Sequence, residues 1–179
     1  MFFFSFFQAQ KAVELLNPPD ISHLKAIRHG IQNEPKAIEK FEKLLNVTIE
    51  PCGLIVHPAY PFLGASPDGK FRYNGEDFLL EIKSPLSAYQ KPLTDSDLQY
   101  INKSGEIDLK TNDPYFSQIQ GQLACSNYKS CYFVVYTGEI KMCRIDRDDA
   151  FIDRMLFQLR SFFEKYFKAA ILNRYFFRT

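Results

Sequence analysis

Gly64-Ala65-Ser66-Pro67-Asp68-Gly69 is a turn that ends in a carboxylate, and Phe78-Leu79-Leu80-Glu81-Ile82-Lys83 is an apolar run that ends in an acid and a base. In a strand, residues two apart share a face, so Glu81 and Lys83 project together while Ile82 turns into the core. Two acids and a lysine that converge are what a hydrolytic Mg²⁺ site for phosphodiesters requires. The spacing therefore predicts a nuclease-like metal site.

Each of these features also has an ordinary structural explanation. Glu-x-Lys at the end of a strand is a common solvated charge pair, and Pro-Asp-Gly is a frequent turn. Their order, with an apolar strand leading into the second feature, favours catalysis more than either feature alone. On these residues by themselves both interpretations stay open.

The composition limits the classes of protein to consider. A chain of 179 residues fits one domain of ordinary size, and 46% hydrophobic residues with 18 Phe and 10 Tyr predict a strongly aromatic core. The net charge of +1 gives no global signature of nucleic-acid binding, so DNA contact must rest on a local patch. The four cysteines lie far apart, which predicts neither a zinc site nor a disulfide framework. We expect reduced thiols in an intracellular protein, nuclear if the host is eukaryotic.

The apolar start of the chain resembles the opening of a signal peptide. Met1 to Phe7 has no basic region before it, and Gln8, Gln10 and Lys11 end it after seven residues. We interpret it as an apolar cap on the core or as the remnant of a trimmed longer chain. No other stretch approaches the length needed to cross a bilayer, so we expect no membrane contact.

The order of elements predicts the fold class. Helices are expected at 9–16, from about 20 past Ile27, from Pro35 to Leu45, at 113–125 and at 148–173. Strands are expected at 47–49, 53–56, 70–73, 78–82, 130–137 and 139–145, with a loop at 84–112 that carries a short helix near 94–101. This order predicts a mixed α/β (α+β) domain, a central mixed β-sheet flanked by helices. We assign 1–20 to an N-terminal extension, 21–173 to the domain and 174–179 to a tail.

Two further stretches carry polar side chains that could join the site. Glu34 lies on the helical segment that precedes the strands, where a third carboxylate could complete a metal shell. On the helix after Asp113, Gln118 and Gln122 are one turn apart and share a face, whereas Gln120 points elsewhere. As isolated features, these are an ordinary solvated glutamate and ordinary surface glutamines.

Four stretches in order resemble the YqaJ-type viral recombinase and phage lambda exonuclease family of the PD-(D/E)xK nuclease superfamily. They are Arg28-x-Gly30-x₃-Glu34, Leu63 to Gly69, Leu80-Glu81-Ile82-Lys83-Ser84-Pro85, and Tyr115-x-x-Gln118-x-Gln120. The similarity spans about residues 25 to 170. Gly-x-Ser-Pro-Asp-Gly followed by Glu-Ile-Lys-x-Pro is far more specific than a bare Asp…Glu-x-Lys. The resemblance implies a PD-(D/E)xK restriction-endonuclease-like core.

The resemblance also implies a role for each matching residue. The implied ligands of Mg²⁺, for which Mn²⁺ can substitute, are Asp68, Glu81, the carbonyl of Ile82, and Glu34. Lys83 would activate water, and Gln118 would be the glutamine of the motif that follows the core. The implied contacts to DNA phosphates are Arg28, Ser66 and Gln120.

The activity implied is that of a metal-dependent deoxyribonuclease, a 5′→3′ exonuclease on duplex DNA ends in recombination or repair. An endonuclease on the same fold and a catalytically silent DNA-binding domain of a transposon- or virus-derived protein are the alternatives. The implied partners are DNA, a single-strand annealing recombinase and further copies of the chain. The segment before Arg28 is short and the linker from Lys83 to Gln118 is long, which leaves end polarity open.

Overall fold

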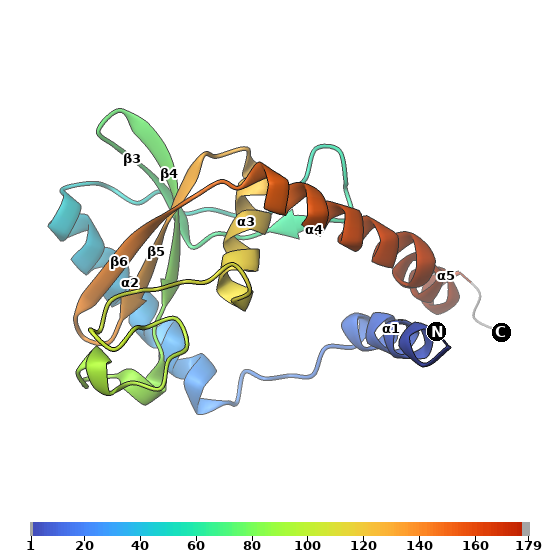
Figure 1. The fold of residues 1–179 in the computed structure, drawn as a ribbon, viewed down its shortest axis with the longest axis horizontal. Coiled ribbons are helices and arrows are strands. Elements are labelled where there is room, and N and C mark those ends of the chain that lie inside the picture. Colours follow the sequence, from blue (N-terminus) through green and yellow to red (C-terminus); the bar gives the residue numbers. More distant parts are fainter. Residues whose placement is uncertain (1, 177–179) are drawn as a thin grey trace. The chain divides into compact units, whose positions relative to one another are not determined.

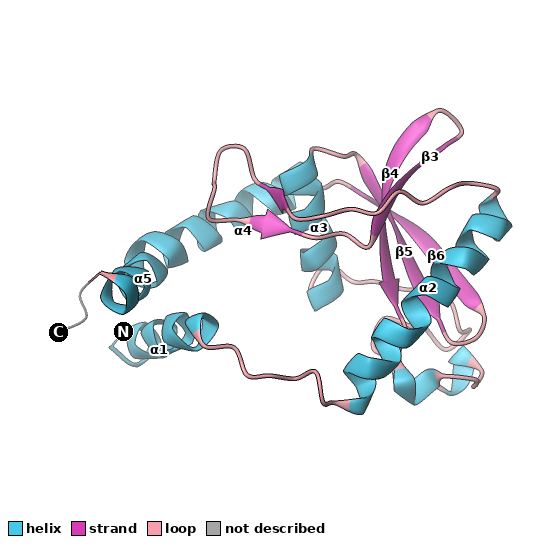
Figure 2. Cartoon of the chain, turned by 180° about the vertical axis from the view of Figure 1, so that it is seen from behind, coloured by secondary structure: helices cyan, strands magenta, loops and turns pink. Residues whose placement is uncertain are grey.

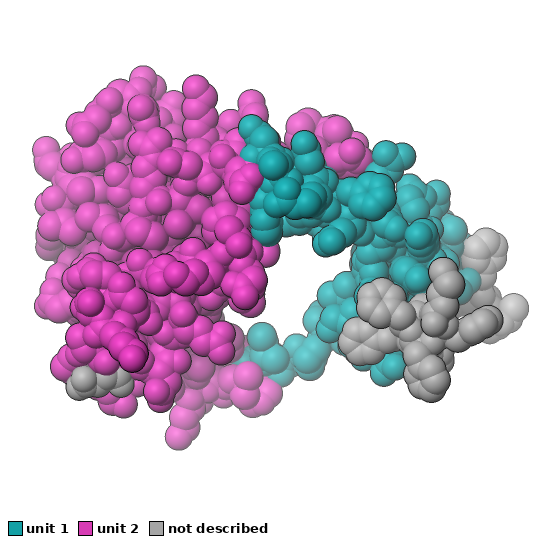
Figure 3. Space-filling model, in the orientation of Figure 1, with its two compact units in different colours: residues 1–21, 149–179 teal, residues 22–148 magenta. Residues whose placement is uncertain are grey.

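The structure, a computed structural model, describes residues 2–176 and divides into two compact units. One unit comprises residues 22–148, and the other comprises residues 1–21 and 149–179 (Figure 3). In this division residues 149–173 group with the N-terminal segment, and the domain boundaries that we assigned from the sequence stay a prediction. Part of the tail assigned to 174–179, residues 177–179, lies outside the described residues.

The unit of residues 22–148 is built on a four-stranded mixed sheet in the order β3-β4-β5-β6 (Figures 1 and 2). The strands are β3 (Gly69–Tyr73), β4 (Glu76–Lys83), β5 (Ser130–Tyr136) and β6 (Ile140–Asp146). Strands β3 and β4 pair antiparallel, β4 and β5 parallel, and β5 and β6 antiparallel. A parallel pair needs a long crossover. Here the segment from 84 to 129 supplies it, including helix α3 (Pro114–Ser126). The central mixed sheet predicted from the sequence is confirmed.

Helices cover both faces of this sheet, and the alternation of β4 explains why. Phe78, Leu80 and Ile82 pack in one apolar cluster with Phe41 of helix α2 (Lys25–Leu45). Leu79 belongs to the opposite cluster, which contains Ile119 and Leu123 of α3. Because side chains alternate along a strand, Glu81 and Lys83 lie on the face that α3 covers. The strand thus places Glu81 and Lys83 beside the same helix.

Helix α2 runs without interruption through Pro35, where the sequence predicted the start of a new helix. It is 21 residues long and contains Pro35, which lacks an amide to donate to the preceding turn. Burial of Asn33, Ala37 and Phe41 on one face offsets this loss, so packing overrides the local signal. The helix ends at Leu45 and is capped by Asn46, which adopts the left-handed conformation with φ of 52°.

The irregular segments also differ in part from the expectation. The predicted strand at 47–49 is absent, and residue Glu50 makes only an isolated bridge to Lys70. The strand predicted at 53–56 is reduced to β1 (Ile55–Val56), which pairs with β2 (Gly64–Ala65) in a separate two-stranded sheet. The predicted helix near 94–101 is a single 3₁₀ turn at Leu93–Asp95, with another at Leu86–Ala88. Clusters of Pro, Ser and Asp favour such turns over regular helix.

The unit of residues 1–21 and 149–179 is helical. It contains α1 (Phe2–Leu16), α4 (Asp149–Phe162), a π-helical turn (Phe163–Phe167) and α5 (Lys168–Tyr175). The Arg174 guanidinium donates hydrogen bonds to the Leu16 carbonyl and, at 2.6 Å, to Asn17 Oδ1. The predicted C-terminal helix is confirmed, with a π turn inside it, and the predicted helix at 9–16 begins earlier. Within residues 2–176, no helix has the length and apolar character to span a bilayer.

Candidate active site

Asp68 is held against strand β4 by two hydrogen bonds. Its amide donates to the Leu80 carbonyl at 3.1 Å, and its Oδ2 accepts from the Ile82 amide at 2.6 Å. The next residue, Gly69, lies so close to Ile49 that an added Cβ would stand 2.4 Å from that side chain. A side chain larger than glycine would therefore clash with Ile49 at this position, next to the residue that bonds to β4.

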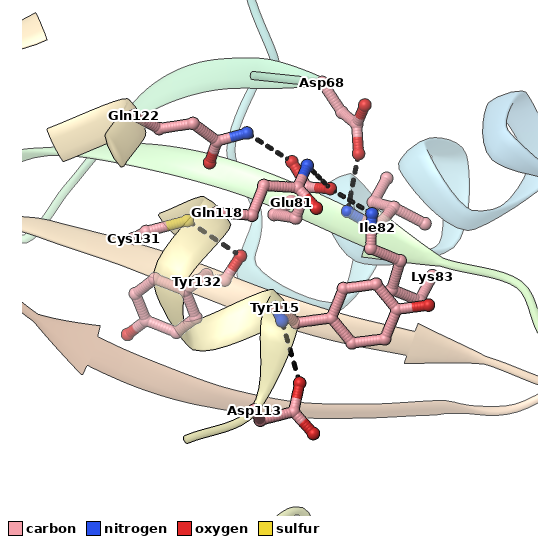
Figure 4. Close-up of polar contacts among 10 residues, drawn as sticks. All are labelled: Asp68, Glu81, Ile82, Lys83, Asp113, Tyr115, Gln118, Gln122, Cys131 and Tyr132. Carbon is pink, nitrogen blue, oxygen red and sulfur yellow. Dashed lines mark hydrogen bonds and ion pairs between the residues drawn. The ribbon is translucent and has the colours of Figure 1, made fainter. Parts of the chain in front are cut away.

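Glu81 is a buried carboxylate with three hydrogen-bond donors. Its exposed fraction is 2%. Its Oε1 accepts from Lys83 and, at 2.7 Å, from Gln118 Nε2, and its Oε2 accepts from Gln122 Nε2 at 2.6 Å (Figure 4). Burial of an ionised carboxylate is costly unless such donors surround it. Donors from strand β4 and from helix α3 therefore converge on the Glu81 carboxylate.

Lys83 is held from two sides. Its ammonium forms an ion pair with Glu81 and lies 4.7 Å from the centre of the Tyr115 ring. The Tyr115 ring packs in turn against Tyr100 and Phe133, with centroids 5.3 and 5.7 Å away. An aromatic face attracts a cation, so the ring limits where the ammonium can go without neutralising it. The lysine is thus a positioned charge beside the two acids.

Acidic side chains outnumber basic ones among the charges that act on Asp68. Burial raises the pKa of Asp68 to about 7, and the neighbouring charge of Glu81 contributes to the rise. The Ile82 hydrogen bond opposes this shift, the charge of Glu34 adds to it, and Lys83 opposes it. The neighbouring carboxylates disfavour the ionisation of Asp68. Such clusters of carboxylates are typical of cation-binding sites.

The donor set fits a hard divalent ion only in part. Among residues 2–176, no group of three His, Cys, Asp or Glu side chains lies close enough to hold an ion together. Asp68 and Glu81 nevertheless lie near enough for the charge of Glu81 to help raise the pKa of Asp68. The β3–β4 register ends at the pair Gly69 and Leu80, so Ile82 lies beyond the part of β4 that pairs with β3. Mg²⁺ is usually held by one or two carboxylates and keeps several waters, so two carboxylates and a carbonyl suffice.

Glu34, Arg28 and Ser66, three further residues of the predicted site, differ in burial and in what surrounds them. Glu34, half-buried on α2, is near enough for its charge to affect Asp68. Arg28 is exposed on the first turn of the same helix and lines a pocket of about 280 Å³ with Lys25, His29, Gln32 and Leu86. Ser66 is exposed two residues before Asp68.

Gln120 lies away from these residues. Its side chain is fully buried, its Nε2 donates to the Asp146 carbonyl at 2.8 Å, and its Oε1 accepts from the Asp148 amide at 2.9 Å. Both ends of the amide therefore hold α3 to the end of β6. With these partners in place, neither end of the amide is directed at a phosphate.

Gln122 and Tyr115 touch the site, although the motif resemblance assigned a role to neither. The signal for Gln122 was present in its spacing of four from Gln118, which put both amides on one helix face. Tyr115 precedes Gln118 by three residues and shares that face. Nothing in the spacing alone distinguished a side chain that supports the lysine from an ordinary core tyrosine.

A family model for the YqaJ-like viral recombinase domain matches residues 7–129. This range includes Asp68, Glu81, Lys83 and the three glutamines of α3. The chain belongs to this family. It is also 30% identical over 138 residues to the uncharacterized protein R354 of Acanthamoeba polyphaga mimivirus. That match covers 72% of this YqaJ-like chain but only 22% of R354, so the chain corresponds to about a fifth of that relative.

Solved structures show the same fold. LHK-Exo in complex with dAMP is 27% identical with a TM-score of 0.71, and the match covers 94% of this chain and 83% of that one. LHK-Exo, an alkaline exonuclease from Laribacter hongkongensis, also matches at 25% identity, with a TM-score of 0.71 and coverage of 94% and 82%. A phage-related exonuclease from Haemophilus somnus 129PT matches at 13% identity with a TM-score of 0.65, over 92% of this chain and 81% of that one. The YqaJ-like domain therefore has the PD-(D/E)xK fold of these exonucleases.

Proposed function

We propose that this YqaJ-like domain is a Mg²⁺-dependent deoxyribonuclease that degrades duplex DNA from its ends in the 5′→3′ direction, in recombination or repair. The observation that carries the proposal is the meeting of Asp68 and Glu81 with Lys83 at the end of β4. A match to an exonuclease crystallised with dAMP, a mononucleotide, supports DNA as the substrate.

The chain's own groups suggest how such a site would work. A divalent ion held by Asp68, Glu81 and the Ile82 carbonyl, with Glu34 as a further carboxylate, would supply charge stabilisation to the scissile phosphate. Lys83 would orient the attacking water and stabilise the negative charge that develops on the phosphate oxygens. Gln118 keeps Glu81 in place at 2.7 Å without adding charge.

The DNA backbone would be held by groups near the start of α2. Arg28, Lys25 and His29 line one small pocket together with Leu86, which follows Lys83 by three residues in the sequence. Basic side chains in such a pocket would fit a phosphate near the one being cleaved. We include Arg28 and the exposed Ser66 among the proposed phosphate contacts.

The test uses purified protein with end-labelled linear duplex and covalently closed circular duplex, each with Mg²⁺ and with EDTA. We expect progressive loss of the linear DNA from its 5′ ends with Mg²⁺, no cleavage in EDTA, and little attack on the circle. Rapid nicking of the closed circle at the same enzyme concentration would instead show an endonuclease on the same metal site. Equal cleavage in EDTA would contradict the metal-dependent mechanism.

A further inference from the structure

Helix α3 carries two buried glutamines whose amides are used in different ways. Gln120 and Gln122 have exposed fractions of 0% and 2%. Gln120 uses both its donor and its acceptor, each on backbone at the end of β6 or just beyond it. Such an amide is a structural cross-link, since both its nitrogen and its oxygen have gained a partner in place of water.

Only one end of the Gln122 amide has a hydrogen-bond partner in the part of the chain that the structure describes. Its Nε2 donates to Glu81 Oε2 at 2.6 Å, whereas its buried Oε1 has no hydrogen-bond partner among the described residues. An unpaired buried acceptor costs about 1–3 kcal/mol. An apolar side chain of the same length would fill the space without that cost. The contact with Glu81 is therefore the reason for an amide at this position.

The hydrogen bonds of Glu81 show what that contact does. Gln122 approaches Oε2 from the buried side, whereas Oε1 receives Lys83 and Gln118. In Figure 4 the Gln122 amide reaches Glu81 from the opposite side to Lys83. Holding one carboxylate oxygen fixes the rotation of the group and so fixes where the other oxygen points. A neutral amide does this while leaving the negative charge of Glu81 undiminished.

We propose that Gln122 is a positioning residue, which holds Oε2 of Glu81 so that Oε1 is presented to the divalent ion. This inference rests on the proposed function, because it assumes that Glu81 binds a metal. Residues that orient a metal ligand commonly change metal affinity by about 10–100-fold when replaced. Gln122 touches neither the DNA nor the reacting atoms in this assignment.

The experiment compares Gln122→Met with Gln120→Met in the full chain. The two changes are chemically identical, lie on the same helix and replace equally buried amides. Mn²⁺ affinity is measured by titration calorimetry without DNA, and thermal unfolding is measured on the metal-free proteins. Cleavage of linear duplex is then followed against Mg²⁺ concentration, with kcat and KM for DNA determined at each.

We expect Gln122→Met to weaken Mn²⁺ binding about 10–100-fold and to raise the Mg²⁺ needed for half-maximal kcat by a similar factor. Its KM for DNA should stay within about twofold, because DNA affinity is spread over many phosphate contacts. Gln120→Met should lower the unfolding midpoint and leave Mn²⁺ affinity within about twofold, since its cross-link does not touch a ligand. Gln122→Asn, whose amide is one methylene too short to reach Glu81, should weaken Mn²⁺ binding in the same direction.

Wild-type Mn²⁺ affinity in both Gln122 variants would overturn the assignment. So would failure of both to fold while Gln120→Met folds, because the amide would then be structural. If the wild-type protein binds Mn²⁺ but cleaves no DNA, the proposed function fails, and the calorimetric comparison still decides the role of Gln122. A wild-type protein that binds no Mn²⁺ overturns both proposals.

Discussion

Asp68 Oδ2 accepts a hydrogen bond of 2.6 Å from the amide of Ile82, the residue between Glu81 and Lys83. This bond ties the turn before β3 to the last residues of β4, beyond the point where the two strands pair. The two acids are thereby brought near each other by backbone geometry, and burial and the charge of Glu81 then raise the pKa of Asp68 to about 7. This arrangement and the donors around Glu81 lead to four testable expectations.

Replacing Asp68 by asparagine should abolish cleavage and stabilise the metal-free protein at pH 8. The carbonyl of the new side chain can still accept from Ile82, but the repelling charge is gone. A pKa raised from 3.8 to about 7 corresponds to about 4 kcal/mol at most in the free energy of unfolding. Urea unfolding at pH 8 and at pH 4 measures the effect, which should vanish at the lower pH. The exposed loop variant Asp97→Asn serves as control, and an equal gain there would contradict the explanation.

The wild-type metal-free protein should lose stability as the pH rises from about 4 to 7. In that window the folded protein keeps a proton on Asp68 that the unfolded chain has already released, so the free energy of unfolding falls with pH. Mg²⁺ or Mn²⁺ must displace this proton, so metal affinity should rise over the same window. Calorimetry at pH 6 in buffers of different ionisation enthalpy should detect proton release. The same release in Asp68→Asn would assign it to another group.

Lys83→Ala should reduce cleavage by about 10²-fold or more, because a positioned group that assists proton transfer contributes that much. The fold should persist, since Tyr115 keeps its contacts with Tyr100 and Phe133. DNA affinity, measured with Ca²⁺ in place of Mg²⁺, should change little because it is distributed over many phosphates. Lys110→Ala removes an exposed lysine paired with Asp108 and is the matched control. Wild-type cleavage rates in Lys83→Ala would show that another residue activates the attacking water.

Glu81→Ala should weaken metal binding and cleavage together, because the ion loses a charged oxygen ligand. Mn²⁺ should restore part of the activity, since it binds such sites more tightly than Mg²⁺ in the usual order of divalent ions. Activity is measured over a range of each metal, beside the metal affinity of the DNA-free protein. Full activity of this variant in EDTA would show that no metal takes part.

The local sequence was sufficient for the features that depend on short-range geometry. Alternation in a strand placed Glu81 and Lys83 on one face, and helical spacing placed Gln118 and Gln122 on one face. The order of strands and helices predicted the mixed sheet, and the motif resemblance predicted the family. These inferences held because each depends on neighbours within a few residues or on a pattern along the chain.

Tertiary structure decided what depends on partners distant in the sequence. Packing of Ala37 and Phe41 carries α2 through Pro35, where local propensity predicted a new helix. The burial of Asp68 beside Glu81 sets its pKa, and no spacing reveals how far water is excluded. Helical spacing separates Gln120 from Gln122, but only the assembled structure shows that Gln120 bonds to the end of β6 and Gln122 to Glu81. Desolvation and hydrogen-bond partnership are properties of assembled surfaces, which is why the sequence alone left these points open.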